Sequence, residues 1–296
     1  MATMLLLCII WGLQQVAIKA VADEMSPLLQ IALRSGISAA LIALLMTFSS
    51  QRFWVRDGTW RAGLLVGILF SLEFLFVAEG LRYTTASHMA VFLYTSPIFT
   101  ALGLQLFLPD ERLRLHQWLG IGLAFSGIVT VFLGGASNPA IGPGMLRGDL
   151  LGVLAGAAWG FATVTVRSSS LSEAAPTKTL QYQLSTAFFL LLPMAFLTGQ
   201  TATVSLTPAV WLNLLFQGVV VSFASYLIWF SLLRTYLASR LSAFSFLTPI
   251  FGVVFGVLLL DEPLSSSFVT GALLVLTGIG LVSCTTLPGL RRGRAQ

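Results

Sequence analysis

Charged residues are scarce in this sequence: Asp, Glu, Lys and Arg make up only 9% of its 296 residues, whereas 56% are hydrophobic. Soluble domains carry about a quarter charged residues, so this chain has too few to cover a surface that faces water. Histidine and cysteine are also rare, with two of each. These four residues lie too far apart to match a metal-site or disulfide spacing, so the composition excludes an ordinary soluble domain and predicts no metal and no other cofactor.

Long apolar runs fill most of the chain. A helix needs about 20 apolar residues to cross a bilayer, and helices satisfy every backbone polar group inside lipid. The sequence therefore predicts an all-α membrane protein with ten transmembrane helices. The predicted spans are residues 3–22, 27–48, 61–81, 84–107, 115–134, 148–168, 178–198, 210–232, 239–260 and 266–285.

The distribution of Lys and Arg between the predicted loops indicates the orientation. With a cytoplasmic N-terminus, the inner loops and the C-terminal tail hold twelve of the 16 Lys and Arg residues, and the outer ends hold two, Arg82 and Arg147. Lys19 and Arg34 fall within spans. Cytoplasmic loops are enriched in these residues, so both termini are predicted to be cytoplasmic. The same bias explains the net charge of +5 without nucleic acid as a partner.

An internal repeat relates the two halves of the chain. Matched residues recur in order at offsets of 148 to 152: Trp11-Gly12 with Trp159-Gly160, Pro97-Ile98-Phe99 with Pro249-Ile250-Phe251, Asp110-Glu111 with Asp261-Glu262, and Gly120 with Gly271. Each half has five predicted helices, an odd number, so the second half must enter the membrane from the opposite side. Inverted repeats of this kind recur in secondary transporters, where they open a central site to each side in turn.

These repeated residues resemble the drug/metabolite transporter superfamily, specifically its EamA-type ten-helix members. The resemblance rests on the two Trp-Gly pairs, on Ser96-Pro97-Ile98 and Thr248-Pro249-Ile250, and on the two Asp-Glu pairs, and it covers essentially the whole chain. It implies two EamA-like five-helix repeats, residues 1–138 and 146–287, followed by a basic cytoplasmic tail, residues 288–296. It also implies a multi-pass protein of the bacterial inner membrane with a central cavity.

Within that family the chain is most similar to YddG-type exporters, because of Glu73 in span three, Trp159 and the aromatic content. It departs from them in the short connection between spans three and four and in Ser96 before the proline. The resemblance implies a secondary transporter that exports aromatic and other neutral amino acids, or related metabolites, by alternating access. We expect a monomer in the lipid bilayer with a small-molecule substrate.

Two other functions remain as alternatives at this stage. One is an exporter or importer of a different small metabolite or drug. The other is an intramembrane enzyme, which is disfavoured because Asp110-Glu111 and Asp261-Glu262 fall on opposite membrane sides and no catalytic set is apparent. No phosphate-binding glycine loop is present either, which disfavours an ATP-driven pump.

Glu73 is the most deeply placed acidic residue, about twelve residues into its span. A charge at the bilayer centre costs about 2.5–3.5 kcal/mol on insertion scales, so it needs a partner or a wet cavity. Glu73 either lines the cavity, contacting a substrate amine or carrying protons, or forms a structural pair with Arg34. Nearer the end of the span, Glu79 and Arg82 are three residues apart and are expected to pair on one helix face.

Further candidate substrate-binding residues are Gln15, which shares a helix face with Lys19, and His88, which can titrate near neutral pH. The alternatives are that Lys19 snorkels toward the interface and that His88 faces the headgroups. Aromatic side chains within the spans either stack on the substrate or pack between helices. The aromatic candidates are Trp11, Tyr94, Trp159, Tyr226 and Phe244.

Two repeat-equivalent prolines, Pro97 and Pro249, lie deep within spans four and nine. Proline removes a helix hydrogen bond and favours a kink, so both are predicted hinges for the transport motion, with a static bend as the alternative. Small residues such as Gly120, Gly271 and Gly278 are spaced for close helix packing in lipid, which is a structural role.

Overall fold

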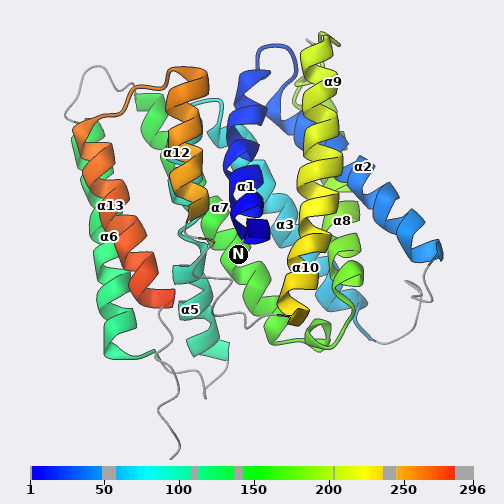
Figure 1. Ribbon diagram of the computed structural model, residues 1–296, viewed down its shortest axis with the longest axis horizontal. Coiled ribbons are helices and arrows are strands. Elements are labelled where there is room, and N and C mark those ends of the chain that lie inside the picture. The colour runs from blue at the N-terminus through cyan, green and yellow to red at the C-terminus, as the bar shows by residue number, and fades with distance from the viewer. Residues whose placement is uncertain are drawn as a thin grey trace, which may run out of the picture.

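The computed structural model describes residues 2–48, 58–107, 113–136, 143–202, 204–235, 245 and 247–283. Within these ranges every regular element is a helix, and the helices lie side by side as a bundle (Figure 1). The first half contains α1 (Ala2–Ala20), α2 (Pro27–Phe48), α3 (Trp60–Gly80), α4 (Ala86–Leu93), α5 (Ser96–Phe107) and α6 (Leu115–Ala136). The second half contains α7 (Pro143–Arg167), η1 (Ser170–Ser172), α8 (Pro176–Leu197), α9 (Pro208–Leu215), η2 (Phe216–Ser225), α10 (Tyr226–Thr235), α12 (Leu247–Leu260) and α13 (Ser266–Ser283).

In the described part of the chain, nine helical stretches are long and apolar enough to cross a membrane. They coincide with nine of the ten predicted spans, which confirms an all-α, multi-span protein. The remaining span, 239–260, is represented by the 14-residue helix α12, and most of the residues before it lie outside the described ranges. Ten crossings therefore stay a prediction.

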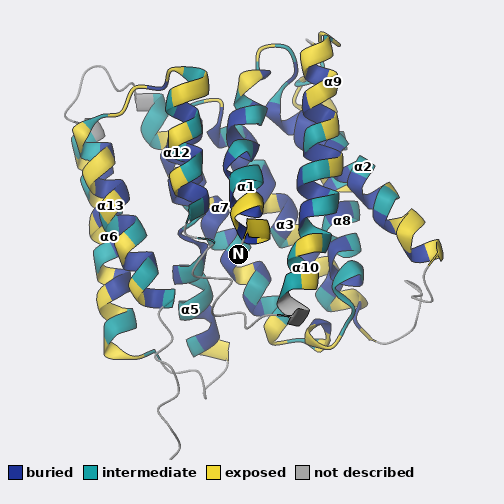
Figure 2. Ribbon diagram, viewed as in Figure 1, coloured by how far each residue is buried: buried dark blue, intermediate teal, exposed yellow. Residues whose placement is uncertain are grey.

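The distribution of burial suits a lipid environment. Large apolar side chains on the outside of the bundle are exposed, such as Leu106 at 78% and Phe189 at 71%, whereas the polar side chains of Arg34 and Gln217 are at most 1% exposed. Figure 2 shows the exposed positions along the outward helix faces and the buried ones between helices. The interior of the bundle thus holds polar groups that the hydrocarbon of a bilayer could not solvate.

Helix α4 ends at Leu93 and α5 begins at Ser96, so the fourth predicted span is interrupted by a turn at Tyr94 and Thr95. The Thr95 hydroxyl donates to the Phe92 carbonyl at 2.6 Å and accommodates the break. Pro97 is the second residue of α5, a position whose N–H would lack a helix partner in any case. The fourth span is therefore broken just before Pro97, and the role of Pro97 as a hinge stays a prediction. Pro249 is the third residue of α12.

The eighth predicted span is one continuous helix whose middle, η2, is wound as a π-helix. A π-helical turn is wider than an α-helical one, and such turns occur frequently at functional sites. Three polar residues of η2 are buried, and they include Gln217 and Ser225. Both make side-chain contacts with other helices, as described below.

Helices α6 and α13 pack backbone against backbone at one edge of the bundle (Figure 1). A Cβ atom added at Gly127 would lie 2.6 Å from the Gly271 carbonyl oxygen, and one at Gly120 would lie 2.6 Å from the Gly278 carbonyl oxygen. Only glycine permits this approach, so the predicted small-residue packing of these helices is confirmed.

The core of the bundle lies between the two halves of the sequence. Helix α1 packs against α12, α2 against α8 and η2, and α3 against α7 and α8. Helix α7 also packs against α4 and α5. Side chains from both halves therefore meet in the middle.

Candidate functional site

Buried polar side chains and half-buried aromatic ones gather in the middle of the bundle, and we call this group the central cluster. Its members come from α1, α2, α3, the turn between α4 and α5, α7, η2 and α10. They are Trp11, Gln14, Gln15, Arg34, Glu73, Tyr94, Trp159, Gln217, Ser225 and Tyr226. Trp11, Gln14 and Gln15 share one face of α1 because they are three and four residues apart.

A chain of hydrogen bonds crosses the cluster. Arg34 donates from Nη1 to the side-chain oxygen of Gln217 at 2.8 Å. Gln217 donates from Nε2 to the backbone carbonyl of Gln14 at 2.9 Å. The Arg34 guanidinium also lies over the ring of Phe74, 4.2 Å from its centroid. These contacts hold the positive charge in place between α1, α2 and η2.

Glu73 lies beside this chain of hydrogen bonds but is not part of it. It is 5% exposed and interacts electrostatically with Arg34, Tyr94 and Tyr226. No direct ion pair links Glu73 to Arg34 in the described residues, and Glu73 Oε2 has no hydrogen-bond partner there. Arg34 Nε and Gln15 Oε1 are likewise without hydrogen-bond partners in the described ranges. Buried polar atoms are rarely left unpaired, so these three atoms are candidate contacts for a bound solute.

Aromatic rings form the walls of the cluster. Trp11 lies 6.5 Å from Tyr226 and 5.6 Å from Trp229, measured between ring centroids, and its indole N–H donates to Ser225 Oγ at 2.8 Å. Tyr94 meets Trp159 edge-on at 5.4 Å. Four of the predicted aromatic residues are therefore brought together, while the fifth, Phe244, lies outside the described residues.

His88 lies apart from the central cluster, toward the end of the bundle where α3 ends and α4 begins. The distribution of Lys and Arg predicts that this end faces the outside, and we call it the outer end. The imidazole Nδ1 lies 2.9 Å from Asp149 Oδ2, and the ring stacks on Phe268 at 3.8 Å. The Thr84 hydroxyl donates to Asp149 Oδ1 at 2.5 Å. His88 is 2% exposed, so its side chain is enclosed by the helices, and a role in substrate binding stays a prediction.

Comparison with known proteins identifies the family. The EamA-like transporter family matches the chain over residues 1–133 and again over residues 146–284. The chain belongs to the EamA-like transporter family. The predicted resemblance to the drug/metabolite transporters is therefore confirmed.

Relatives of this EamA-like chain are also named as transporters. An uncharacterized transporter of Bacillus subtilis (strain 168), YoaV, is 25% identical over 273 residues, which cover 92% of each chain. A probable amino-acid metabolite efflux pump of Salmonella typhimurium is 25% identical over 287 residues, covering 93% of this chain and 91% of the pump. A pump of the same description in Escherichia coli (strain K12) is 24% identical over 288 residues, with coverage of 93% and 91%.

A solved crystal structure aligns with 94% of this chain and 94% of its own, with a TM-score of 0.65 and 18% sequence identity, which is a likeness of fold. Together, the family and its relatives establish a membrane transporter and point away from an enzyme. In the described ranges no group of three or more His, Cys, Asp or Glu side chains is placed to hold a metal ion.

The sequence did not reveal the role of Glu262 in this EamA transporter. Asp261 has a left-handed backbone, with φ of 52°, at the end of α12, and the next residue, Glu262, reaches the N-terminus of α4. Its carboxylate accepts from the backbone N–H groups of Ala86 at 2.6 Å and Ser87 at 2.9 Å, and from the Ser87 hydroxyl at 2.6 Å. A carboxylate is favoured at a helix N-terminus, so Glu262 joins α12 to α4. Its repeat equivalent, Glu111, lies outside the described residues.

Lys19 and Glu79 complete the polar contacts of the outer end. Lys19 donates to the backbone carbonyls of Leu81 and Thr84, so its ammonium group lies where α3 ends, at the outer end. Glu79 pairs with Arg82 at 2.8 Å, as predicted, and also accepts from Gln200 at 2.6 Å. These contacts bring together α1, α3 and the segment after α8.

Proposed function

We propose that this EamA transporter is a secondary transporter that exports amino acids, aromatic and other neutral ones, or related small metabolites. It would act in the bacterial inner membrane, with both termini cytoplasmic, by alternating access through a central cavity between two inverted repeats, residues 1–138 and 146–287. The relatives described as probable amino-acid metabolite efflux pumps support this substrate class.

The observation that carries the proposal is that the central cluster holds two oppositely charged side chains. In the described residues, each of them has a buried atom without a hydrogen-bond partner. Glu73 Oε2 is available to an ammonium group, and Arg34 Nε is available to a carboxylate. A zwitterionic amino acid presents both groups on one carbon atom. Because isolated charges are costly in a buried site, a ligand that supplies both complementary charges is favoured over one that supplies neither.

The aromatic rings beside these charges support preference for a flat or apolar side chain. Trp11, Tyr226, Tyr94 and Trp159 present ring surfaces next to the charged residues. Ligand sites are commonly lined by apolar and aromatic groups, with a few polar groups that set orientation. In this arrangement the charges orient the backbone of the amino acid, and the rings contact its side chain.

The contacts between helices support the inverted-repeat part of the proposal. Helix α1 packs on α12, and its repeat counterpart α7 packs on α4 and α5, which correspond to the α12 span. The pairs α2 with α8 and α6 with α13 each join two repeat-equivalent helices. Contacts that map onto one another when the halves are exchanged are expected of a two-fold related architecture.

Purified protein in liposomes tests the proposal directly. We expect uptake of labelled neutral and aromatic amino acids from a panel, and competition between them. A rate that rises with an imposed pH gradient indicates proton coupling, whereas an unchanged rate indicates facilitated diffusion. Absence of flux for every amino acid would overturn the substrate assignment, and flux of another metabolite or drug class would favour the alternative transporter.

A further inference from the structure

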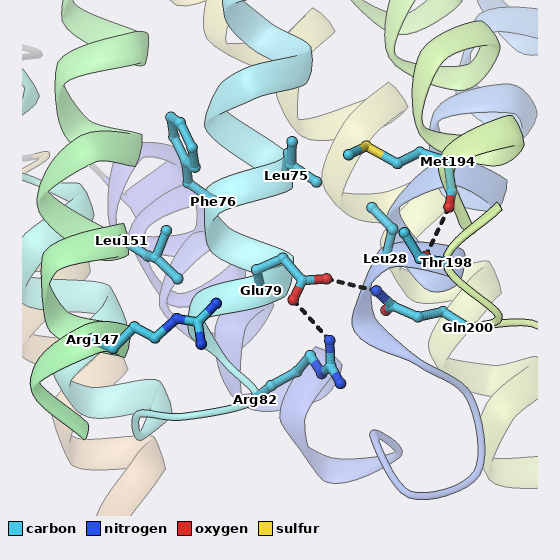
Figure 3. Close-up of a pocket in the computed structure, with 10 residues that line it drawn as sticks. All are labelled: Leu28, Leu75, Phe76, Glu79, Arg82, Arg147, Leu151, Met194, Thr198 and Gln200. Atoms are coloured by element: carbon cyan, nitrogen blue, oxygen red, sulfur yellow. Dashed lines mark hydrogen bonds and ion pairs between the residues drawn. The ribbon is translucent and has the colours of Figure 1, made fainter. Parts of the chain in front are cut away.

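A pocket opens at the outer end between α2, α3, α7 and α8, with a cavity volume of about 280 Å³ (Figure 3). Both arginines that the charge distribution assigns to the outer side, Arg82 and Arg147, line this one pocket. Cations are normally depleted on the outer side of a membrane protein. Their convergence on a single pocket therefore indicates a ligand that needs positive charge.

The lining changes from apolar to polar along three helices in the same direction. On α3, Phe76 precedes Glu79, and Arg82 follows the helix end. On α7, Leu151 lies one turn deeper in the bundle than Arg147, and Met194 of α8 lies deeper than Gln200. Figure 3 shows Leu75, Phe76 and Met194 toward one end of the pocket and Arg82 and Arg147 toward the other. The ligand must itself be amphipathic to match this gradient.

The charges of the lining show what the polar end can bind. Both carboxylate oxygens of Glu79 are occupied, one by Arg82 at 2.8 Å and one by Gln200 at 2.6 Å. The Arg147 guanidinium lies over the Tyr83 ring, 4.6 Å from its centroid, and has no ion pair in the described part of the chain. Two arginines and one glutamate leave one net positive charge. That charge complements the single negative charge of a phosphodiester.

We propose that this pocket binds a membrane phospholipid, with its phosphate between Arg82 and Arg147 and an acyl chain along Phe76, Leu151 and Met194. Arginine binds phosphate through paired N–H donors. The lipid would bridge α3 and α7, which belong to different halves of the chain. This site is separate from the central cluster and does not depend on the substrate proposed above.

Photolabelling tests the site in the full-length protein. Protein reconstituted with phosphatidylglycerol that carries a photoreactive group in one acyl chain is irradiated, and the labelled peptides are identified by mass spectrometry. We expect label on the segments around Phe76, Leu151 and Met194. The double variant R82Q/R147Q should reduce this label about tenfold, because charge-assisted hydrogen bonds to the phosphate are lost.

Arg61 provides the matched control. It lies at the opposite end of α3 and stacks over Trp60, 5.2 Å from the ring centroid, much as Arg147 stacks over Tyr83. R61Q should leave the label unchanged. Equal labelling of wild type and R82Q/R147Q would overturn the proposal.

A competition experiment on the wild-type protein tests the site a second time without any variant. Unlabelled phosphatidylglycerol should displace the label, whereas dioleoylglycerol, which lacks the phosphate, and glycerol 1-phosphate, which lacks the chains, should not. Displacement by dioleoylglycerol would show a groove that binds only acyl chains. Displacement by glycerol 1-phosphate would show a site for soluble anions, and either result contradicts a phospholipid site.

Discussion

Arg34 and Gln217 join the two halves of the transporter through one buried hydrogen bond, 2.8 Å from Nη1 to the side-chain oxygen. The bond links α2 to the π-helical segment η2. It engages one side of the guanidinium and leaves Nε without a hydrogen-bond partner in the described ranges. Arg34 is thereby held in place while one donor stays available, which is the arrangement expected of a binding residue.

Replacing Arg34 by methionine should destabilise the protein. The change removes the bond to Gln217 and leaves Glu73 buried without its nearby positive charge. Loss of a hydrogen bond to a charged group costs about 1.5–3 kcal/mol, so the unfolding midpoint in detergent should fall clearly. Arg61→Met, an exposed change at the start of α3, should shift stability by no more than about 0.5 kcal/mol. Equal midpoints for the two variants would contradict the structural role of Arg34.

Glu262→Gln should weaken the contact between α12 and α4. Hydrogen bonds to a charged group are worth about 1.5–3 kcal/mol, and the glutamine amide can accept at only one oxygen where the carboxylate used two. We expect a lower midpoint of thermal unfolding, measured beside Glu173→Gln, an exposed glutamate at the end of η1. No difference between these two variants would show that the Glu262 contact contributes little.

Pro97→Ala should slow transport without reducing insertion into the membrane. Alanine supplies the N–H that proline lacks and favours continuous helix, which would join α4 to α5 across Tyr94 and Thr95. Turnover in liposomes should fall several-fold if the break is a hinge. Pro193→Ala is the matched control, because Pro193 lies inside α8 and outside the interrupted span. Turnover equal to that of wild type would refute the hinge.

Gly127→Leu should lower stability without changing transport per folded molecule. The added side chain would meet the Gly271 carbonyl and force α6 away from α13, and overpacking of this kind costs about 1–3 kcal/mol. Gly122 on the same helix has open space around it, so Gly122→Leu should be tolerated. Thermal unfolding and flux, measured on both variants, check the prediction. A large loss of flux in correctly folded Gly127→Leu protein would show that α6 takes part in transport.

Much of the fold was predictable because apolar length is a local property of the chain. Nine of the ten predicted spans coincide with long apolar helices in the described residues. Glu73 and Trp11 were predictable for the same reason, since a charged or aromatic residue inside a span is visible without knowing its neighbours. The interruption at Tyr94 was not predicted, because a helix break depends on partners for the freed backbone groups.

The partners of the buried charges were beyond sequence reasoning. Asp149 lies at the start of the sixth predicted span, and nothing local indicates that it meets His88, 61 residues away. The contact between Glu262 and α4 likewise depends on how α12 packs, although the Asp-Glu pair itself was visible in the repeat. Gln217 was missed because a glutamine in a span carries little signal until its bond to Arg34 is seen.

The most direct test of the account is counterflow of labelled phenylalanine into liposomes by wild-type protein, Glu73→Gln and Glu173→Gln. Glutamine keeps the size of Glu73 but removes the charge that would hold the substrate ammonium, a charge-assisted contact worth about 1.5–3 kcal/mol. We expect at least a roughly tenfold lower rate for Glu73→Gln, with normal folding by size exclusion and thermal unfolding, and an unchanged rate for Glu173→Gln. If correctly folded Glu73→Gln protein showed the same counterflow rate as the wild type, that result would contradict a substrate-binding role for the central cluster.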